Sequence, residues 1–253
     1  GCAPAQKPLT DYVNPMLGTA TLWDSVDLGF KPTKRTWGAE VFPGSSLPNA
    51  MVQVSPVTKF HSGAGYQYED SVIYGFTHTN KGHWNLCHIP LLPVTGTPTP
   101  GDYCSPFSHE RESAAPGYYQ VFLDRYGVDA QLSSTLRCAF HKYTYPAGAA
   151  ASLLADLQRS NEHVRAWDIR KEGDNVFAGW QQTGEKMYFY AVANRPVTGI
   201  EPVVEGDREV RIVRFGEGDG ALELRIGFSF VSEKNARENL EAEMLGKSFA
   251  EVR

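Results

Sequence analysis

Hydrophobic and polar residues alternate with a period of two over most of the chain. This alternation is typical of half-buried β-strands. It predicts strands at residues 50–55, 118–123, 128–137, 139–145, 187–193, 210–215 and 221–230. Glycine, proline, asparagine and aspartate separate these segments, and 171–175, 204–209 and 216–220 have the composition of tight turns. We therefore expect an all-β fold, a large antiparallel β-sandwich.

The end of the chain has a different period. Ala236, Leu240 and Met244 recur every four residues, which predicts an amphipathic helix with one hydrophobic stripe. Asn235 is placed to cap this helix and Gly246 to end it. The stripe needs a partner, which is either the sheet or a domain outside this chain. We divide the chain into a flexible tether (1–10), a sandwich domain (11–231) and the start of a linker helix (232–253).

Composition excludes several classes of function. The 253 residues are 42% hydrophobic and 21% charged, which is enough to bury a full core. The net charge of -5 gives no basic surface for nucleic acid. No hydrophobic run approaches the roughly 20 residues that span a bilayer. Four cysteines, without a CxxC pair, are too few and too irregular for a disulfide framework or a structural zinc site.

Cys2 follows Gly1 directly, and a flexible stretch follows it. A bacterial lipoprotein begins at a cysteine that follows a small residue of its signal peptide. We interpret Cys2 as such a lipidation site, which predicts a location in the bacterial cell envelope, periplasmic or at the cell surface. The alternative is that Cys2 is an ordinary residue and that its neighbour Gly1 remains from cloning.

Residues 73–96 combine aromatic, polar and metal-capable side chains: His78, His83, Trp84, Asn85, Cys87 and His88. The three histidines are spaced five residues apart with no carboxylate between them, so histidines that hydrogen-bond at a cleft are favoured over a metal site. A nucleophile pair of Cys87 and His88 is disfavoured, because neighbours on a strand point to opposite faces. Cys87 is better explained as a small buried hydrophobic residue.

A sugar-binding loop fits this composition best. A pyranose presents a hydrophobic face to an aromatic ring and hydroxyl groups to amides and imidazoles. Trp84 supplies the first kind of contact, and Asn85, His78 and His83 supply the second. Gly65 would let the backbone approach a ligand. The alternative is that Trp84 belongs to the core.

Two pairs of carboxylates lie close together in the sequence. These are Glu69 with Asp70 and Glu110 with Glu112. Carboxylate pairs carry out hydrolysis in inverting glycosidases, where they stand about 6.5–9.5 Å apart. Nothing in the sequence places either pair at a cleft, so we interpret both as structural or solvated.

Five motifs in order resemble one enzyme family. They are YVNPMLGT (12–19), FPGSSLPNAMVQVSP (42–56), AGYQYEDSVIYGFTHT (64–79), ERESAAPGYYQVFL (110–123) and LSSTLRCAFHKYTYP (132–146). Together they resemble the amino-terminal domain of the glycoside hydrolase family 92 α-mannosidases. The terminal stretch NARENLEAEM resembles the link into the second domain of that family. The loop NKGHWNLCHIP departs from the glycine-rich sequence common in the family.

The resemblance implies a supersandwich of the galactose mutarotase type, followed in the whole enzyme by an (α/α)6 catalytic domain. It implies calcium-dependent, inverting hydrolysis of mannose-containing glycans. The catalytic carboxylates and the calcium ligands would come from the second domain, so we predict no catalytic residue, no metal ligand and no hydrolysis by this chain alone. Its partners would be the glycan and its own (α/α)6 domain. The alternative is a free-standing carbohydrate-binding lipoprotein.

Overall fold

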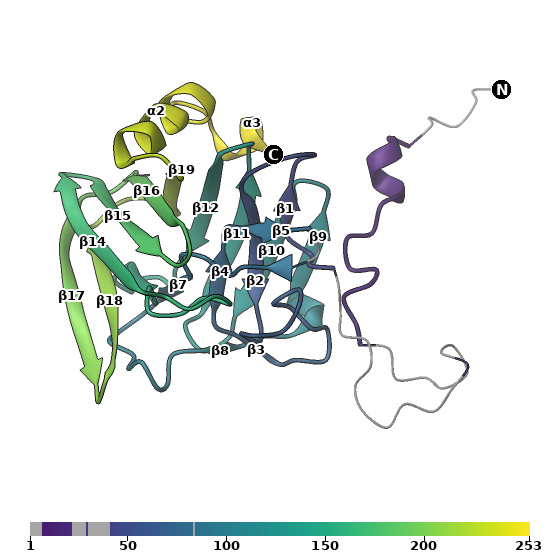
Figure 1. Ribbon diagram of the computed structural model, residues 1–253, viewed down its shortest axis with the longest axis horizontal. Helices are drawn as coiled ribbons and strands as arrows, with labels where there is room; N and C mark the ends of the chain where they lie inside the picture. The colour runs from purple at the N-terminus through teal and green to yellow at the C-terminus, as the bar shows by residue number, and fades with distance from the viewer. Residues whose placement is uncertain (1–6, 22–28, 30–40, 83) are drawn as a thin grey trace.

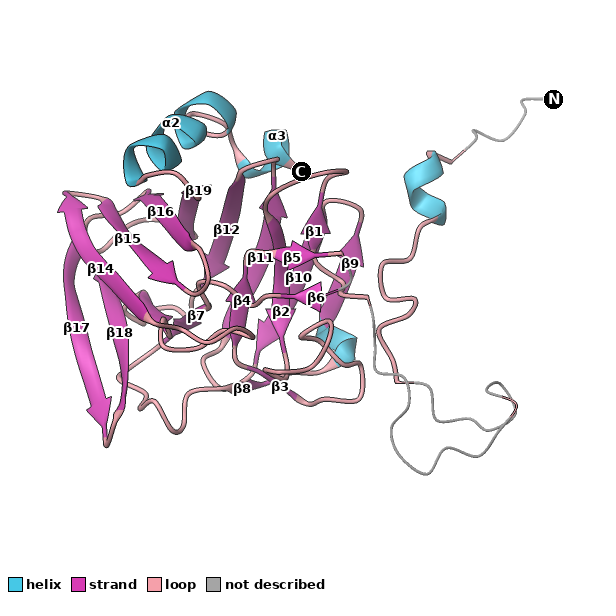
Figure 2. Cartoon of the chain, in the orientation of Figure 1, coloured by secondary structure: helices cyan, strands magenta, loops and turns pink. Residues whose placement is uncertain are grey.

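Two antiparallel sheets form the domain. The computed structural model describes residues 7–21, 29, 41–82 and 84–253. Figure 1 shows the two sheets facing each other, with the terminal helices over one end and the N-terminal segment at one side. Figure 2 shows that strands make up most of the domain and that helices lie at its C-terminal end. The predicted all-β antiparallel sandwich is confirmed.

The first sheet has seven strands in the order β1-β2-β4-β7-β13-β18-β17. The bounds are β1 (Ser45–Ser46), β2 (Gln53–Val57), β4 (Gly75–Thr77), β7 (Leu91–Val94), β13 (Ser152–Ala155), β18 (Arg208–Phe215) and β17 (Val197–Glu205). The central strands β7 and β13 are buried throughout, whereas β17 is an edge strand with mostly exposed or half-buried residues.

The second sheet has eight strands in the order β14-β15-β16-β19-β12-β11-β10-β9. The bounds are β14 (Ala166–Gly173), β15 (Val176–Gln182), β16 (Lys186–Ala193), β19 (Leu222–Ser229), β12 (Cys138–Thr144), β11 (Val128–Ser134), β10 (Tyr118–Leu123) and β9 (Glu112–Ala115). Two short ribbons pair β3 (Val72–Ile73) with β8 (Ser105–Pro106) and β5 (Asn80–Lys81) with β6 (Trp84–Asn85). Single turns of 3-10 helix are η1 (Leu9–Tyr12) and η2 (His109–Arg111).

The predicted strands match the observed ones with small shifts. β10 occupies the predicted 118–123, and every second residue of β16 is buried. The strand predicted at 50–55 begins later, as β2 at Gln53. The reason is that the amides of Met51 and Val52 donate to the carbonyl of Leu136 instead of joining the ladder. One continuous core of aromatic and aliphatic side chains from both sheets lies between the layers.

The C-terminal helices pack back on the eight-stranded sheet. Helix α2 (Glu233–Glu243) lies over β19, β16 and β12, and the short α3 (Phe249–Val252) follows it. Ala236, Leu240 and Met244 are all buried there, so the sandwich itself covers the predicted stripe. Ser232, and not Asn235, caps α2, because its hydroxyl accepts from the Asn235 amide at 3.0 Å.

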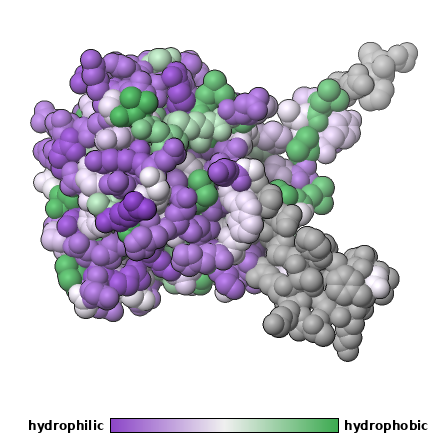
Figure 3. Space-filling view, viewed as in Figure 1, coloured by the Kyte–Doolittle hydropathy of each residue, from purple (hydrophilic) through white to green (hydrophobic). Residues whose placement is uncertain are grey.

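The N-terminal segment leaves several hydrophobic side chains in solvent. Leu9, Tyr12, Val13 and Leu17 are 56% to 85% exposed. Figure 3 shows hydrophobic residues of this segment standing clear of a mostly hydrophilic face. Thr19 ties the segment to the sandwich, because its carbonyl accepts from the Tyr68 amide at 3.0 Å. In the described part of the chain, no helix combines the length and the hydrophobicity that a membrane span needs.

Candidate functional site

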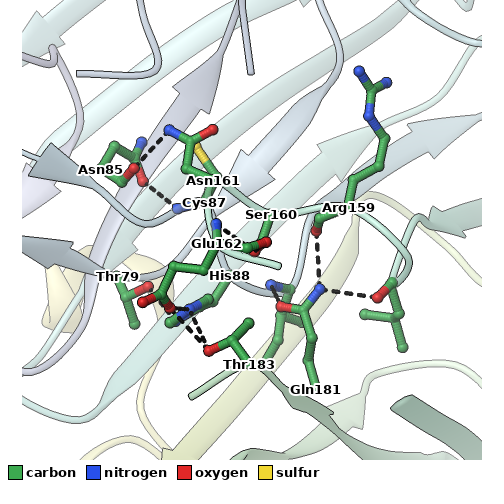
Figure 4. A network of polar contacts seen from close by, with 12 residues as sticks. Thr79, Asn85, Cys87, His88, Arg159, Ser160, Asn161, Glu162, Gln181 and Thr183 are labelled. Atoms are coloured by element: carbon green, nitrogen blue, oxygen red, sulfur yellow. Dashed lines mark hydrogen bonds and ion pairs between the residues drawn. The ribbon is translucent and has the colours of Figure 1, made fainter. Parts of the chain in front are cut away.

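Three loops that are distant in sequence meet at one edge of the sandwich. They are residues 58–65, residues 78–90 with the β5–β6 ribbon, and residues 156–165 after strand β13. Figure 4 shows the side chains of Asn85, Asn161, Glu162 and His88 converging where these loops touch. We call this place the Trp84 site, because Trp84 stands at its rim.

Trp84 does not belong to the core. It is the first residue of β6, and 56% of its surface is exposed to solvent. A hollow of about 250 Å³ opens beside it, lined by His61, Ser62, Trp84, Asn85, Leu86 and Asn161. An exposed indole next to backbone and amide groups can stack on the hydrophobic face of a sugar ring while polar groups bind its hydroxyls.

Asn161 joins the three loops through its side-chain amide. Its Nδ2 donates to the carbonyls of Ser62 at 3.1 Å and of Asn85 at 2.7 Å. Its Oδ1 accepts from the His61 amide at 2.6 Å. The backbone adds a bond, because the Asn161 amide donates to the Leu86 carbonyl at 2.9 Å. One side chain therefore sets the relative positions of the loops that form the hollow.

Replacing Asn161 should loosen this site. We expect Asn161→Ala to lower the free energy of unfolding by about 2 kcal/mol, because it leaves one amide and two carbonyls without partners in a partly buried place. Asn161→Asp keeps the acceptor but turns a charged oxygen toward the carbonyls of Ser62 and Asn85, so its cost at neutral pH should be at least as large as that of Asn161→Ala. Urea denaturation of the three proteins measures this order. Equal stability of all three would contradict the role given to Asn161.

His88 belongs to the second of these loops and joins it to the third through Glu162. Its Nε2 lies 2.6 Å from Oε2 of Glu162, and its Nδ1 lies 2.8 Å from the Thr79 hydroxyl. Thr183 donates to the same Glu162 oxygen at 2.9 Å. Burial lowers the pKa of His88, although the contact with Glu162 acts in the opposite direction. A neutral imidazole that donates from Nε2 and accepts at Nδ1 satisfies both contacts.

The backbone on either side of His88 is strained. Cys87 and Ile89 both have φ of 53°, and His61 has φ of 62°. This region is unfavourable for residues with a side chain, above all for β-branched isoleucine, and costs about 1–3 kcal/mol per residue. Two bonds hold it: the Cys87 amide donates to Oδ1 of Asn85 at 2.8 Å, and the Ile89 amide donates to Oε1 of Gln181 at 2.8 Å. Strain of this kind concentrates at functional sites.

The other residues predicted to bind sugar are buried or fall outside the described residues. The ring of His78 is fully buried and its Nε2 lies 3.0 Å from Nε2 of His141, so direct contact of His78 with a sugar was a wrong prediction. Asn85 lines the hollow, but its side chain is 1% exposed and its Oδ1 is bonded inside the loop. Gly65 has φ of 73°, and a Cβ at this position would meet the side chains of Asn85 and Cys87 rather than an open surface. His83 lies outside the described residues, as does Cys2.

Among the residues that the structure describes, this site contains neither a thiolate nor a cluster of metal ligands. Cys87 is buried, and burial raises the pKa of its thiol, so it stays protonated at neutral pH. Both ring nitrogens of His88 are engaged by Thr79 and Glu162. Within the described ranges, no three histidine, cysteine, aspartate or glutamate side chains are placed to hold a metal ion.

Three carboxylates of the two sequence pairs form hydrogen bonds within the domain. Oε1 of Glu69 accepts from the Thr21 amide at 2.6 Å, and Oδ2 of Asp70 accepts from the Thr58 hydroxyl at 2.7 Å. Glu112 is almost fully buried, and three side chains bond to it: Tyr66, Tyr119 and His109. These contacts anchor the chain at residues 66–70 and 109–112.

Comparisons with known proteins agree on one family. Residues 12–237 match the model of the glycosyl hydrolase family 92 N-terminal domain. The structure of the family GH92 α-mannosidase BT3965 from Bacteroides thetaiotaomicron is similar with a TM-score of 0.83 and 26% identity, over 98% of this chain and 36% of that one. The same enzyme in complex with mannoimidazole gives a TM-score of 0.82 and 25% identity, over 97% and 35% of the two chains.

A third similar structure extends the likeness in fold. The family GH92 inverting mannosidase BT2199 from Bacteroides thetaiotaomicron VPI-5482 has a TM-score of 0.76 at 22% identity, over 96% of this chain and 35% of that one. The chain thus spans about a third of the length of these solved structures. A search of curated proteins finds no match.

Proposed function

Because the chain belongs to glycosyl hydrolase family 92 and forms its N-terminal domain, we propose that it serves an α-mannosidase by lining one side of the sugar-binding cleft. The observation that carries this proposal is Trp84, an exposed indole beside a hollow that strained and cross-bonded loops maintain. The sugar is the terminal part of a mannose-containing glycan. The complex of BT3965 with mannoimidazole supports mannose as the type of sugar.

The catalytic step belongs, in this proposal, to a second domain of (α/α)6 type. That domain supplies the general acid, the general base and the ligands of a calcium ion, and hydrolysis inverts the configuration at the anomeric carbon. The inverting mannosidase among the similar structures supports the stereochemistry. We further propose that the protein lies in the bacterial cell envelope and carries a lipid on Cys2, which mass spectrometry of the protein from its own cells would detect.

The role of Trp84 can be tested by one substitution. In the α-mannosidase that carries this domain, we expect Trp84→Ala to lower kcat/KM by about 10–200-fold, which corresponds to about 1–3 kcal/mol of transition-state binding. The melting temperature should change little, because 56% of Trp84 is exposed in the domain. Steady-state kinetics on mannobiosides and thermal melts measure the two effects separately.

Trp180→Ala is the matched control. Trp180 is a half-buried tryptophan of β15, with the ammonium of Lys186 3.7 Å from its ring, and it takes no part in the Trp84 site. Its removal should leave kcat/KM unchanged. Loss of melting temperature with full kcat/KM in Trp84→Ala would end the proposal that this residue binds sugar.

One observation favours a second candidate function. The hydrophobic stripe of α2 is covered by the sandwich itself, so the domain needs no neighbour to bury it. A free-standing carbohydrate-binding protein would have this property. Such a protein would bind mannosides without hydrolysing them, and Trp84→Ala would weaken that binding to a similar degree.

A further inference from the structure

The Trp84 hollow is the first of three hollows that border the loop of residues 158–164. A second hollow, of about 380 Å³, shares His61 and Asn161 with it. The second hollow in turn shares Gln158, Arg159 and Val164 with a third, of about 660 Å³. The loop of residues 158–164 thus borders all three hollows, and we interpret them as one groove that follows this loop away from Trp84.

The far end of the groove also contains a tryptophan. Trp167, near the start of β14, packs against the core and remains half-buried at the wall of the third hollow. The guanidinium of Arg211 lies 4.8 Å from the centre of its ring, and the same guanidinium is bonded to Oε2 of Glu209 at 2.9 Å. These contacts fix the indole at the wall of the third hollow.

The charges at the far end nearly balance. Four arginines line the third hollow together with three carboxylates: Arg159, Arg165, Arg208, Arg211, Asp168, Asp207 and Glu209. A phosphate or nucleic-acid site would instead have a clear excess of positive charge. Interleaved donors and acceptors beside an aromatic ring suit pairs of neutral hydroxyl groups. The volume lies in the range of about 300–1,000 Å³ that holds ligands larger than one small fragment.

We propose that this groove binds several consecutive units of a neutral mannose-containing oligosaccharide, with Trp84 at one end and Trp167 at the other. The type of sugar rests on the proposed function. The new element is the length of the ligand: the domain selects chains of sugars over single mannosides, and Trp167 and Arg165 contact the units farthest from Trp84. Arg165 is exposed at the rim of the third hollow and is free to turn toward a ligand.

The dependence of affinity on ligand length tests this proposal. Calorimetric titration of the 253-residue chain with linear α-linked mannose oligosaccharides, from two to six units, gives one dissociation constant for each length. The ratio of the constants for two and six units should be at least tenfold in the wild type. It should fall close to one in Trp167→Ala and decrease several-fold in Arg165→Ala, which removes an exposed side chain and spares the fold. Trp180→Ala should keep the wild-type ratio.

Each result has a defined meaning. A wild-type ratio near one, with the disaccharide still bound, overturns the groove and leaves the Trp84 site standing. A ratio of at least tenfold that persists in both Trp167→Ala and Arg165→Ala also overturns the groove. If the wild type binds no mannoside of any length, the groove is overturned, and the kinetics of Trp84→Ala in the α-mannosidase decide the proposed function separately.

Discussion

At pH 5 we expect the domain to be less stable than at pH 7.5 by about 4 kcal/mol, because unfolding releases two histidines that the core keeps neutral. His78 and His141 face each other with their Nε2 atoms 3.0 Å apart, and both rings are fully buried between the sheets. Burial lowers the pKa of His78 to about 3, and burial and the neighbouring His78 lower that of His141 well below its ordinary value. The Tyr143 hydroxyl lies 2.5 Å from the remaining nitrogen of His141.

The direction of these pKa shifts determines whether the domain gains or loses stability as the pH falls. In the unfolded chain each histidine takes up a proton below about pH 6.5, whereas in the folded chain it does not until far lower pH. Stability is therefore complete above pH 6.5 and is lost as pH falls, by about 1.4 kcal/mol per unit for each histidine. The lowered pKa of His88 adds to this loss, and the raised pKa of the buried Asp156 opposes it.

Urea denaturation at pH 7.5, 6 and 5 measures this dependence. His141→Gln removes one of the two side chains that take up a proton on unfolding, and it keeps a group that can hydrogen-bond to His78. About half of the stability loss between pH 7.5 and pH 5 should therefore remain. A domain that is equally stable at pH 5 and pH 7.5 would show that these histidines are charged, or hydrated, in the folded state.

Gly227→Ala should destabilise the domain by about 3 kcal/mol, the upper end of the usual cost of forcing extra atoms into a packed interior. Gly227 lies in β19, a strand with a neighbour on each side, directly under helix α2. A Cβ there would lie 2.8 Å from Cβ of Leu240 and would clash with the carbonyl of Ala236. The helix would have to lift away, which exposes the stripe that the sheet covers.

Gly184→Ala is the matched control for this steric effect. Gly184 lies outside the strands, its φ is not positive, and a Cβ there meets no atom within 4 Å. Chemical denaturation should find it close to the wild type. Circular dichroism should register loss of helix only for Gly227→Ala. If both variants are as stable as the wild type, the helix is not packed as closely as the structure has it.

The pattern of the sequence predicted the architecture well, because alternation reports directly on which face of a strand is buried. It placed β10 residue for residue, and the family resemblance carried by five motifs is confirmed. It did not predict that the amides of Met51 and Val52 would donate to the carbonyl of Leu136, since that contact joins distant parts of the chain. It also misjudged the cap of α2, because both Ser232 and Asn235 are good caps by composition.

The site was harder to predict than the fold. Composition singled out Trp84, which is indeed exposed, but composition cannot say which neighbours of an aromatic residue point inward. His78 lies six positions before Trp84 in the chain and yet faces the core. Asn161 and Glu162 could not be predicted, because only the tertiary fold brings them to the loop. The one available signal was a polar stretch, QRSNEH at 158–163, directly after a buried strand.

The side-chain bonds of Asn161 have a consequence for the order in which the protein folds. They join residues that are 76 to 100 positions apart, and such contacts form only after a long loop has closed. The sheets that bring the loops together must therefore exist before the hollow does. In the mature protein the same bonds lie at an edge, where local opening needs less free energy than global unfolding. A newly made chain should thus acquire its sandwich first and its capacity to hold a sugar last, and a warming protein should lose them in the reverse order.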